Sequence, residues 1–188
     1  GSVSRLLNAL RLAVTASIVR RHRRHYPKGM PALLVYGHPQ SRPHGPDAYF
    51  GDLMAHMPQL VRIMHVDADL SIVRKFSSDP RTFSLHAWGT PMGALAMVLT
   101  KWHPCVADVR GKNAWLVRRQ AAVEGANAQA LLIRWQEECQ RAWLADAKPS
   151  IVAWPWENLH WERRFVTDAK LCGIRTIGYQ HATIGRHA

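Results

Sequence analysis

The residues best suited to chemistry lie near the end of the chain, where a carboxylate and a histidine each follow a short apolar segment. Glu157 comes just after residues 150–154 (SIVAW), and His181 comes just after residues 175–179 (RTIGY). If both segments are strands of one parallel sheet, both side chains reach the same edge of it. There, Glu157 can act as a general base or accept hydrogen bonds from sugar hydroxyls, and His181 can donate to a phosphate or move a proton near neutral pH.

Neighbouring residues add to this pair. Tyr179 and Gln180 supply polar groups at the same edge, and Trp154 and Trp156 flank Glu157 with aromatic faces of the kind that pack on sugar rings. Purely structural roles are the alternatives. Glu157 suits the first turn of a helix, where the dipole favours a carboxylate, and His181 can bond a neighbouring loop.

Two strand-helix-strand units must position these residues. The second unit comprises the strand 150–154, a helix over 157–172 ending at Gly173, and the strand 175–179; the inner side of its helix carries Trp161, Phe165, Ala169 and Cys172. The first unit comprises a strand over 32–36, a Gly/Pro/His loop over 37–46, a helix over 49–57 and a strand over 60–66. His38 in that loop is a candidate binding residue, because ligands bind beyond the carboxyl ends of strands. The pattern predicts an α/β fold with a mostly parallel, Rossmann-like sheet flanked by helices.

Helices are predicted between the two units. The segment 88–102 is apolar, and 113–146 is one long helix or a pair broken near Gly125 and Asn127. A helical stripe marks the buried side of the later part: Leu131, Leu132, Trp135, Cys139, Ala142 and Trp143. We expect residues 1–30 to form a basic amphipathic helix and linker, and 31–188 to form one α/β domain with a helical insertion at about 87–147.

The N-terminal segment 4–25 is predicted to be an amphipathic helix. Leu6, Leu10, Val14 and Ile18 recur every four residues, Leu7 and Ala13 widen the stripe, and the helix closes on Arg20-Arg-His-Arg-Arg24. Two interpretations remain open. The helix packs on the body with a solvated basic end, or it attaches to an anionic inner-membrane surface.

Charge and cysteine content narrow the function class. The formal net charge is +12, but residues 1–46 hold eight Arg and Lys and no Asp or Glu, so the excess belongs mainly to this segment. A nucleic-acid-binding face would also include an excess of basic residues in the folded body, and the charge excess lies mainly outside it. We therefore expect no nucleic-acid partner. Three widely separated cysteines fit a reducing cytoplasm, with peripheral membrane attachment as the alternative location.

Asp67-Ala-Asp69 follows the strand 60–66 and is the one pattern suggestive of a metal. Two carboxylates one residue apart can hold a divalent cation with a nucleotide diphosphate. Asp is also a common helix cap, and a helix is expected from Leu70 to Lys75. Capping is the favoured interpretation, and we expect no metal site.

The two units carry a family resemblance. Glu157-Asn-Leu-His-Trp-Glu162 followed by Ile177-Gly-Tyr-Gln-His181-Ala resembles the E-N-x-x-W-E … I-G-[YF]-Q-H-[SA] signature of bacterial surface-carbohydrate biosynthesis proteins, which are glycosyltransferase-like proteins of O-antigen and capsule clusters. Asp47-Ala-Tyr-Phe-Gly-Asp-Leu53 is similar to that family's Y-F-G-x-L region. The resemblance covers residues 32–66 and 150–184.

The resemblance implies a GT-B architecture, in which two Rossmann-like domains face a cleft. This chain would supply the acceptor side, with a nucleotide-activated sugar and a glycan acceptor as its ligands and no cofactor. Glu157 and His181 would be the catalytic positions. The other motif positions, Asn158, Trp161, Glu162 and Gln180, would bind substrate together with Tyr179 and His38. Because a second domain needs on the order of 150 further residues, we expect this chain to be inactive in transfer alone. A non-catalytic carbohydrate- or membrane-associated module is the alternative.

Overall fold

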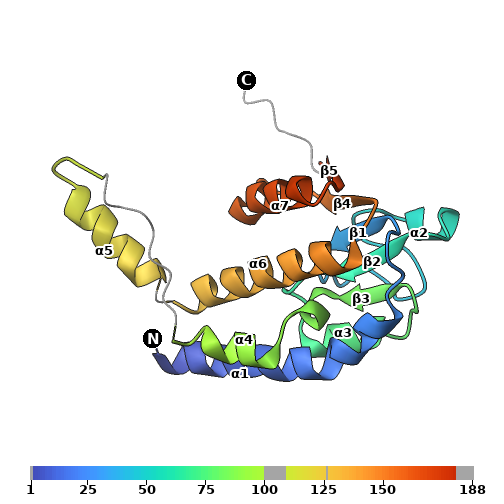
Figure 1. The fold of residues 1–188 in the computed structure, drawn as a ribbon, viewed down its shortest axis with the longest axis horizontal. Helices are drawn as coiled ribbons and strands as arrows, with labels where there is room; N and C mark the ends of the chain where they lie inside the picture. The colour runs from blue at the N-terminus through green and yellow to red at the C-terminus, as the bar shows by residue number, and fades with distance from the viewer. Residues whose placement is uncertain (1, 100–108, 126, 181–188) are drawn as a thin grey trace.

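The protein is an α/β fold built on a five-stranded sheet in which every pair of neighbouring strands is parallel (Figure 1). The computed structural model describes residues 2–99, 109–125 and 127–180. The strand order is β3-β2-β1-β4-β5. The strands are β1 Ala32–Val35, β2 Val61–Met64, β3 Thr82–Ser84, β4 Ile151–Pro155 and β5 Arg175–Tyr179. An all-parallel sheet flanked by helices is consistent with a Rossmann-like fold and confirms the predicted fold class.

Helices account for most of the remaining described residues. In chain order they are α1 Ser2–Val19, η1 Arg20–His25, α2 Leu53–His56, α3 Leu70–Phe76, η2 Leu85–Trp88, α4 Pro91–Ala96, α5 Ala114–Gly125, α6 Ala128–Ala147 and α7 His160–Leu171, where η marks a 3-10 helix. Figure 1 shows α1 and α4 side by side along one side of the molecule, α7 on the opposite side and α6 between them. Among the residues described, no helix combines the length and apolarity needed to cross a bilayer.

The strands β1 and β4 form where the sequence has consecutive apolar residues. Every residue of β1 and β2 is buried, as expected for central strands of a parallel sheet that is covered on both faces. Aromatic rings then join the sheet to its helices. Trp143 of α6 stacks on Phe165 of α7 with ring centroids 6.3 Å apart, and Trp154 of β4 meets Phe165 edge-on at 5.5 Å. Such pairs contribute roughly 0.5–1.5 kcal/mol beyond their buried area.

A buried arginine lies in the middle of the sheet. The Arg62 guanidinium donates to Thr82 Oγ1 at 3.0 Å, to Asp79 Oδ2 at 3.2 Å and to the Pro43 carbonyl at 2.7 Å, and it lies 3.6 Å from Asp47 Oδ2. Its side chain is fully buried. Burial lowers the pKa of Arg62, while the two carboxylates oppose that change. This network, the Arg62 network, connects β2 to the start of β3 and to the loop after β1.

Several predicted elements are confirmed. The strand over 175–179 has the predicted bounds, and the strands over 32–36, 60–66 and 150–154 differ from β1, β2 and β4 by one or two residues at an end. The helical segment 113–146 is a broken pair, with Asn127 as the N-cap of α6 through its side-chain bond to the Ala130 amide. The stripe predicted on α6 faces the core, with Trp135, Cys139 and Trp143 fully buried.

Other predicted elements are wrong. The helix expected over 49–57 is only the four residues of α2, because residues 47–51 form a turn closed by paired backbone bonds between Asp47 and Gly51. The helix expected over 88–102 is present only in part: among the described residues it is α4, Pro91–Ala96, with Thr90 as its N-cap, while Trp88 belongs to η2. Cys172 is exposed rather than on the inner side of the helix, because α7 ends at Leu171.

The largest correction concerns α1. The residues that face the body are Ala9, Leu12, Ala13, Ala16 and Val19, whereas the predicted apolar stripe is exposed apart from Ala13. Both sides of the helix are apolar, so periodicity alone could not select the packed side. The helix also ends at Val19, and the basic residues that follow form the 3-10 helix η1.

The Arg62 network predicts a large stability effect. Replacing Arg62 with Met leaves Asp47 and Asp79 buried without their cation, so we expect the free energy of unfolding to fall by about 3–5 kcal/mol. Chemical denaturation monitored by circular dichroism measures this. Arg74→Met, on the exposed side of α3, is the matched control and should change stability by less than about 0.5 kcal/mol. Equal effects of the two substitutions would contradict the assigned role.

A buried histidine predicts a pH dependence. Nδ1 of His86 accepts from the Trp135 indole at 2.8 Å, and burial lowers the pKa of His86 to about 4. The unfolded chain, with a histidine pKa of about 6.5, therefore binds a proton that the folded state does not, and stability falls as pH drops from about 6.5 to about 4. In His86→Gln the slope of unfolding free energy against pH should be smaller by about 1 kcal/mol per pH unit in that window. Identical slopes would show that His86 does not titrate as inferred.

Candidate functional site

The sheet has one point where the order of its strands reverses. From β1 the chain continues to β2 and β3 on one side, whereas β4 and β5 lie on the other side of β1. Ala32 of β1 accordingly pairs with Val61 of β2 and with Val152 of β4. In open parallel sheets the crevice beyond the carboxyl ends of the strands at such a switch point is the usual ligand site.

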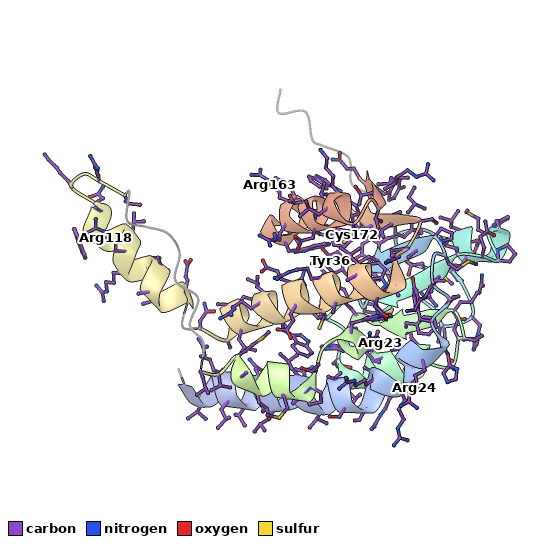
Figure 2. The ribbon with its side chains drawn as sticks, in the orientation of Figure 1. Arg23, Arg24, Tyr36, Arg118, Arg163 and Cys172 are labelled. Carbon is purple, nitrogen blue, oxygen red and sulfur yellow. The ribbon has the colours of Figure 1, made fainter. Side chains whose placement is uncertain are left out.

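Polar and aromatic side chains gather around this point. The ring of Tyr36, which follows β1, lies 6.0 Å from the ring of Tyr49 and 5.1 Å from that of His65, and the His38 ring lies 5.7 Å from Tyr49. Figure 2 shows Tyr36 in the interior, where the strands meet the long helix α6. We define the switch-point cluster as Tyr36, His38, Tyr49, His65, Asp67, Glu157 and Trp161.

The floor of the cluster is buried. Trp161 of α7 is only 3% exposed, and its ring lies 5.0 Å from His65 and 6.4 Å from Tyr36. The sequence placed Trp161 among the substrate-binding residues. The structure instead places its indole beneath the polar groups, where it supports Tyr36 and His65 rather than offering an open face for stacking.

His65 and Asp67 form a pair that connects two strand ends. Nδ1 of His65 lies 3.6 Å from Asp67 Oδ1, and the other oxygen of Asp67 accepts from the Gly37 amide at 3.3 Å. A Cβ on Gly37 would lie 3.1 Å from the Cβ of Ala68, so glycine permits this close approach of the two loops. Neither ring nitrogen of His65 has a hydrogen-bond partner within the described part of the chain. A buried imidazole beside a carboxylate can accept or donate a proton once a ligand reaches it.

The two tyrosines of the cluster keep their protons. Burial raises the pKa of Tyr36 well above its usual value, and the charges of Glu162, Glu157 and Asp67 raise it further. The Trp161 indole partly offsets that rise, although the two groups do not reach hydrogen-bonding geometry. Burial and the charges of Glu157 and Asp67 also raise the pKa of Tyr49. Both phenols can therefore donate hydrogen bonds, while the nearby carboxylates accept them.

Glu162 organises the turn after β4. It is fully buried at the start of α7, and its two oxygens accept from the amides of Glu157 at 2.9 Å and Leu159 at 3.0 Å. Asn158 between them has a φ of 57°, a left-handed conformation that Asn tolerates better than most residues. Glu162 was grouped with the substrate-binding residues by the sequence. In the structure its oxygens are engaged by the backbone, so it positions the exposed Glu157.

The remaining predicted residues are distributed differently. Tyr179 is half-exposed on β5, with its ring 5.6 Å from Phe50 and its carbonyl accepting from the Trp156 amide at 2.7 Å. It therefore adjoins the turn after β4 without joining the contacts of Tyr36. Gln180 is exposed. His181, predicted as a catalytic residue, lies outside the described residues.

The two tryptophans around Glu157 have different environments. Trp154 is 2% exposed and packs against Phe165, so it belongs to the core and is not available to a sugar ring. Trp156 is partly exposed, and a Cβ on Gly178 of β5 would come within 2.9 Å of its ring. Of the pair, Trp156 is the one that retains an accessible aromatic surface.

A small polar cavity lies beside the cluster, beyond the ends of β2 and β3. It has a volume of about 150 Å³, and its lining includes Asn8, Arg11, Thr15, Asp67, His86 and Gln129. Asp69 at its rim caps α3, because its Oδ1 accepts from the Ile72 amide at 2.9 Å and from the Ser71 hydroxyl at 2.6 Å. Capping, the favoured interpretation of Asp69, is thus confirmed. Residues 2–99, 109–125 and 127–180 contain no group of three or more His, Cys, Asp or Glu that could hold a metal ion.

Three residues of the cluster were missed by sequence reasoning: Tyr36, Tyr49 and His65. For Tyr36 and His65 a signal was present, because each comes directly after a buried strand, at the edge where ligands bind. Tyr49 lies in a turn, and its position over Tyr36 depends on the Arg62 network that fixes this turn.

Comparisons with protein-family models, curated proteins and solved structures find no match to this chain. The resemblance to surface-carbohydrate biosynthesis proteins therefore stays a prediction, based on the motif residues alone.

The role of Glu162 can be tested directly. Glu162→Gln replaces one of the two accepting carboxylate oxygens with an NH2 group that cannot accept a hydrogen bond. We therefore expect the amides of Glu157 and Leu159 to exchange faster and stability to fall by about 1–3 kcal/mol. Hydrogen exchange followed by NMR measures the first effect, and denaturation measures the second. Glu124→Gln, an exposed residue of α5, is the control for both readouts. Unchanged exchange at Glu157 and Leu159 would mean that the turn does not depend on Glu162.

Proposed function

We propose that this chain is the acceptor-side, glycan-binding domain of a glycosyltransferase-like protein of bacterial surface-polysaccharide biosynthesis. The observation that carries the proposal is the convergence of tyrosine, histidine and carboxylate side chains at the switch point of an all-parallel sheet. The motif of residues 157–162 and 177–182 supplies the family and the reaction.

The chemistry of the cluster suits a polyhydroxylated ligand. Sugar hydroxyls both donate and accept hydrogen bonds, and here the protonated Tyr36 and Tyr49 can donate while Glu157 and Asp67 can accept. The partly exposed Trp156, which precedes Glu157 in the sequence, offers an aromatic face. This combination of donors, acceptors and an aromatic surface favours carbohydrate over a purely apolar ligand.

Charge favours the acceptor over the donor. The acidic groups of the switch-point cluster are the carboxylates of Asp67 and Glu157, which raise the pKa values of both tyrosines. A nucleoside diphosphate is anionic and would be repelled by these carboxylates, whereas a neutral glycan would not. The donor's diphosphate therefore belongs on a facing domain.

In the proposed reaction a hydroxyl oxygen of the acceptor glycan attacks the anomeric carbon of the activated sugar. The new carbon–oxygen bond forms as the bond from that carbon to the diphosphate oxygen breaks, and the nucleoside diphosphate leaves with the electron pair. The proton of the attacking hydroxyl passes to the Glu157 carboxylate, which is exposed at the end of β4. His181, which lies outside the described residues, would orient substrate oxygens.

A non-catalytic carbohydrate-binding module at a membrane is the second candidate function. The exposed apolar side of α1 favours it, since a membrane-associated module needs such a surface. Both candidates require glycan binding at the switch-point cluster, and only the first requires a proton acceptor at residue 157.

The proposed function is tested by glycan binding and transfer. On an array of bacterial oligosaccharides the chain should bind at least one glycan, and Tyr49→Phe should weaken that binding about three- to tenfold through loss of one hydrogen bond. Tyr26→Phe, in the core against Phe83 and Trp88, is the matched control and should leave affinity unchanged.

Glu157→Gln separates catalysis from binding. Together with a donor-binding domain, this variant should lose transfer while its glycan affinity falls less than about tenfold, because Gln still forms hydrogen bonds but cannot take the proton. Unchanged transfer would refute the base assignment. Absence of binding to every glycan would refute the acceptor-domain proposal itself.

A further inference from the structure

The polarity of helix α1 is the reverse of that expected for a surface helix: a charged side chain lies on its buried side and large apolar side chains lie on its exposed side. Its buried side includes a charged residue, Arg5, whose guanidinium donates to the carbonyls of Met97 at 2.9 Å and Gly125 at 3.2 Å. Small and medium apolar residues such as Ala9 and Ala16 fill the rest of that side. A surface helix of a globular protein ordinarily turns its charges outward and its leucines inward.

The outward side of α1 is apolar instead. Six large side chains on it are between 38% and 73% exposed: Val3, Leu6, Leu7, Leu10, Val14 and Ile18. We call them the α1 stripe. Their spacing of three and four residues places them on one side of the helix, over a length of about 22 Å. Figure 1 shows α1 along the outer side of the molecule, and Figure 2 shows side chains projecting from it away from the sheet.

A basic cluster follows the stripe. Arg20, Arg21 and Arg24 of η1 are exposed and have no carboxylate partner among residues the structure describes. Arg24 points away from the fold near the end of α1 (Figure 2). Arg23 turns inward and shares Asp146 with Lys28 at 2.8 and 2.9 Å. These five basic residues and Asp146 line an open hollow of about 560 Å³.

The stripe and the cluster together specify their partner. An exposed apolar strip of this length is unusual on a monomeric protein and marks a contact surface. A second copy of the chain could cover the stripe, but residues 1–46 contain no Asp or Glu that could pair with the three arginines if the same segments met. A bilayer with anionic headgroups provides both an apolar phase and negative charge. A helix with an apolar side and basic residues is the form that lies in a membrane interface.

We propose that α1 and η1 form an interfacial docking surface for an anionic lipid bilayer. The α1 stripe inserts at the boundary between headgroups and acyl chains, and Arg20, Arg21 and Arg24 bind lipid phosphates. The buried face of α1, anchored by Arg5, holds the α/β body against the membrane. The assignment is independent of the glycan site.

Vesicle flotation with the full chain tests the docking surface. The protein should float with vesicles containing about one third phosphatidylglycerol in phosphatidylcholine, and bind phosphatidylcholine alone much more weakly. The triple variant Arg20→Gln, Arg21→Gln, Arg24→Gln should lose about 100-fold in affinity, since each basic residue near an anionic surface contributes about fivefold. The stripe variant Leu7→Gln, Leu10→Gln, Val14→Gln should lose at least about tenfold.

Matched controls lie on the opposite side of the molecule. Arg163→Gln, Lys170→Gln and Arg175→Gln together remove the same charge from α7 and β5, and Leu171→Gln removes a leucine that is 81% exposed. Both controls should bind vesicles as the unchanged protein does. All the altered side chains are exposed, and circular dichroism verifies that each variant is folded.

Three results would overturn the proposal. The first is failure of the unchanged chain to float with anionic vesicles. The second is equal loss of binding in the control charge variant, which would show that overall net charge alone drives association. The third is a concentration-dependent dimer that the stripe variant abolishes while vesicle binding is unaffected, which would assign the stripe to a second copy of the chain.

Discussion

The position of the candidate site depends on a single buried cation. Arg62 occupies the middle of a central strand, where the sheet is closed to water on both faces, and its guanidinium reaches two other parts of the chain, residues 43–47 and residues 79–82. One of these, the segment from Pro43 to Asp47, continues into the turn that carries Tyr49. Asp47 accepts from the amides of Tyr49 and Phe50 as well as facing Arg62. The interior of the sheet and the ligand-facing turn are thus parts of one polar network.

A buried carboxylate fixes each of the two loops of the site. Asp47 in the loop after β1 and Glu162 beneath the turn after β4 are buried carboxylates whose oxygens accept from backbone amides. Each accepts hydrogen bonds from partly buried backbone amides, and each holds a neighbouring residue at the sheet edge. The carboxylates of Glu157 and Asp67 are more exposed, so a ligand can reach them. The buried carboxylates therefore position the two loops, and the exposed carboxylates are the candidates for chemistry.

The sequence predicted the parts of the fold in which local pattern and tertiary environment agree. The strands β1 and β4 are runs of apolar residues, β2 is apolar apart from Arg62, and the break before α6 coincides with an Asn that caps it. The short strand β3, Thr82–Ser84, gave no such run and was missed. For α1 the pattern was ambiguous, since leucines and alanines lie on both sides. The packed side is determined by close approach of small residues and by the buried bonds of Arg5, which no periodicity reveals.

For the site, the motif predicted which residues lie together, but it did not predict the role of each residue as well. Glu157 and His38 do lie at the switch point, but Trp161 and Glu162 support the site from below. His65 and Tyr49 enter it only through tertiary contacts.

The central claim is that the switch-point cluster binds a glycan. Hydrogen-exchange mass spectrometry of the full chain, with and without a saturating oligosaccharide, tests it most directly. The account predicts protection over residues 36–50, 65–69 and 156–159. Protection confined to other segments would contradict it.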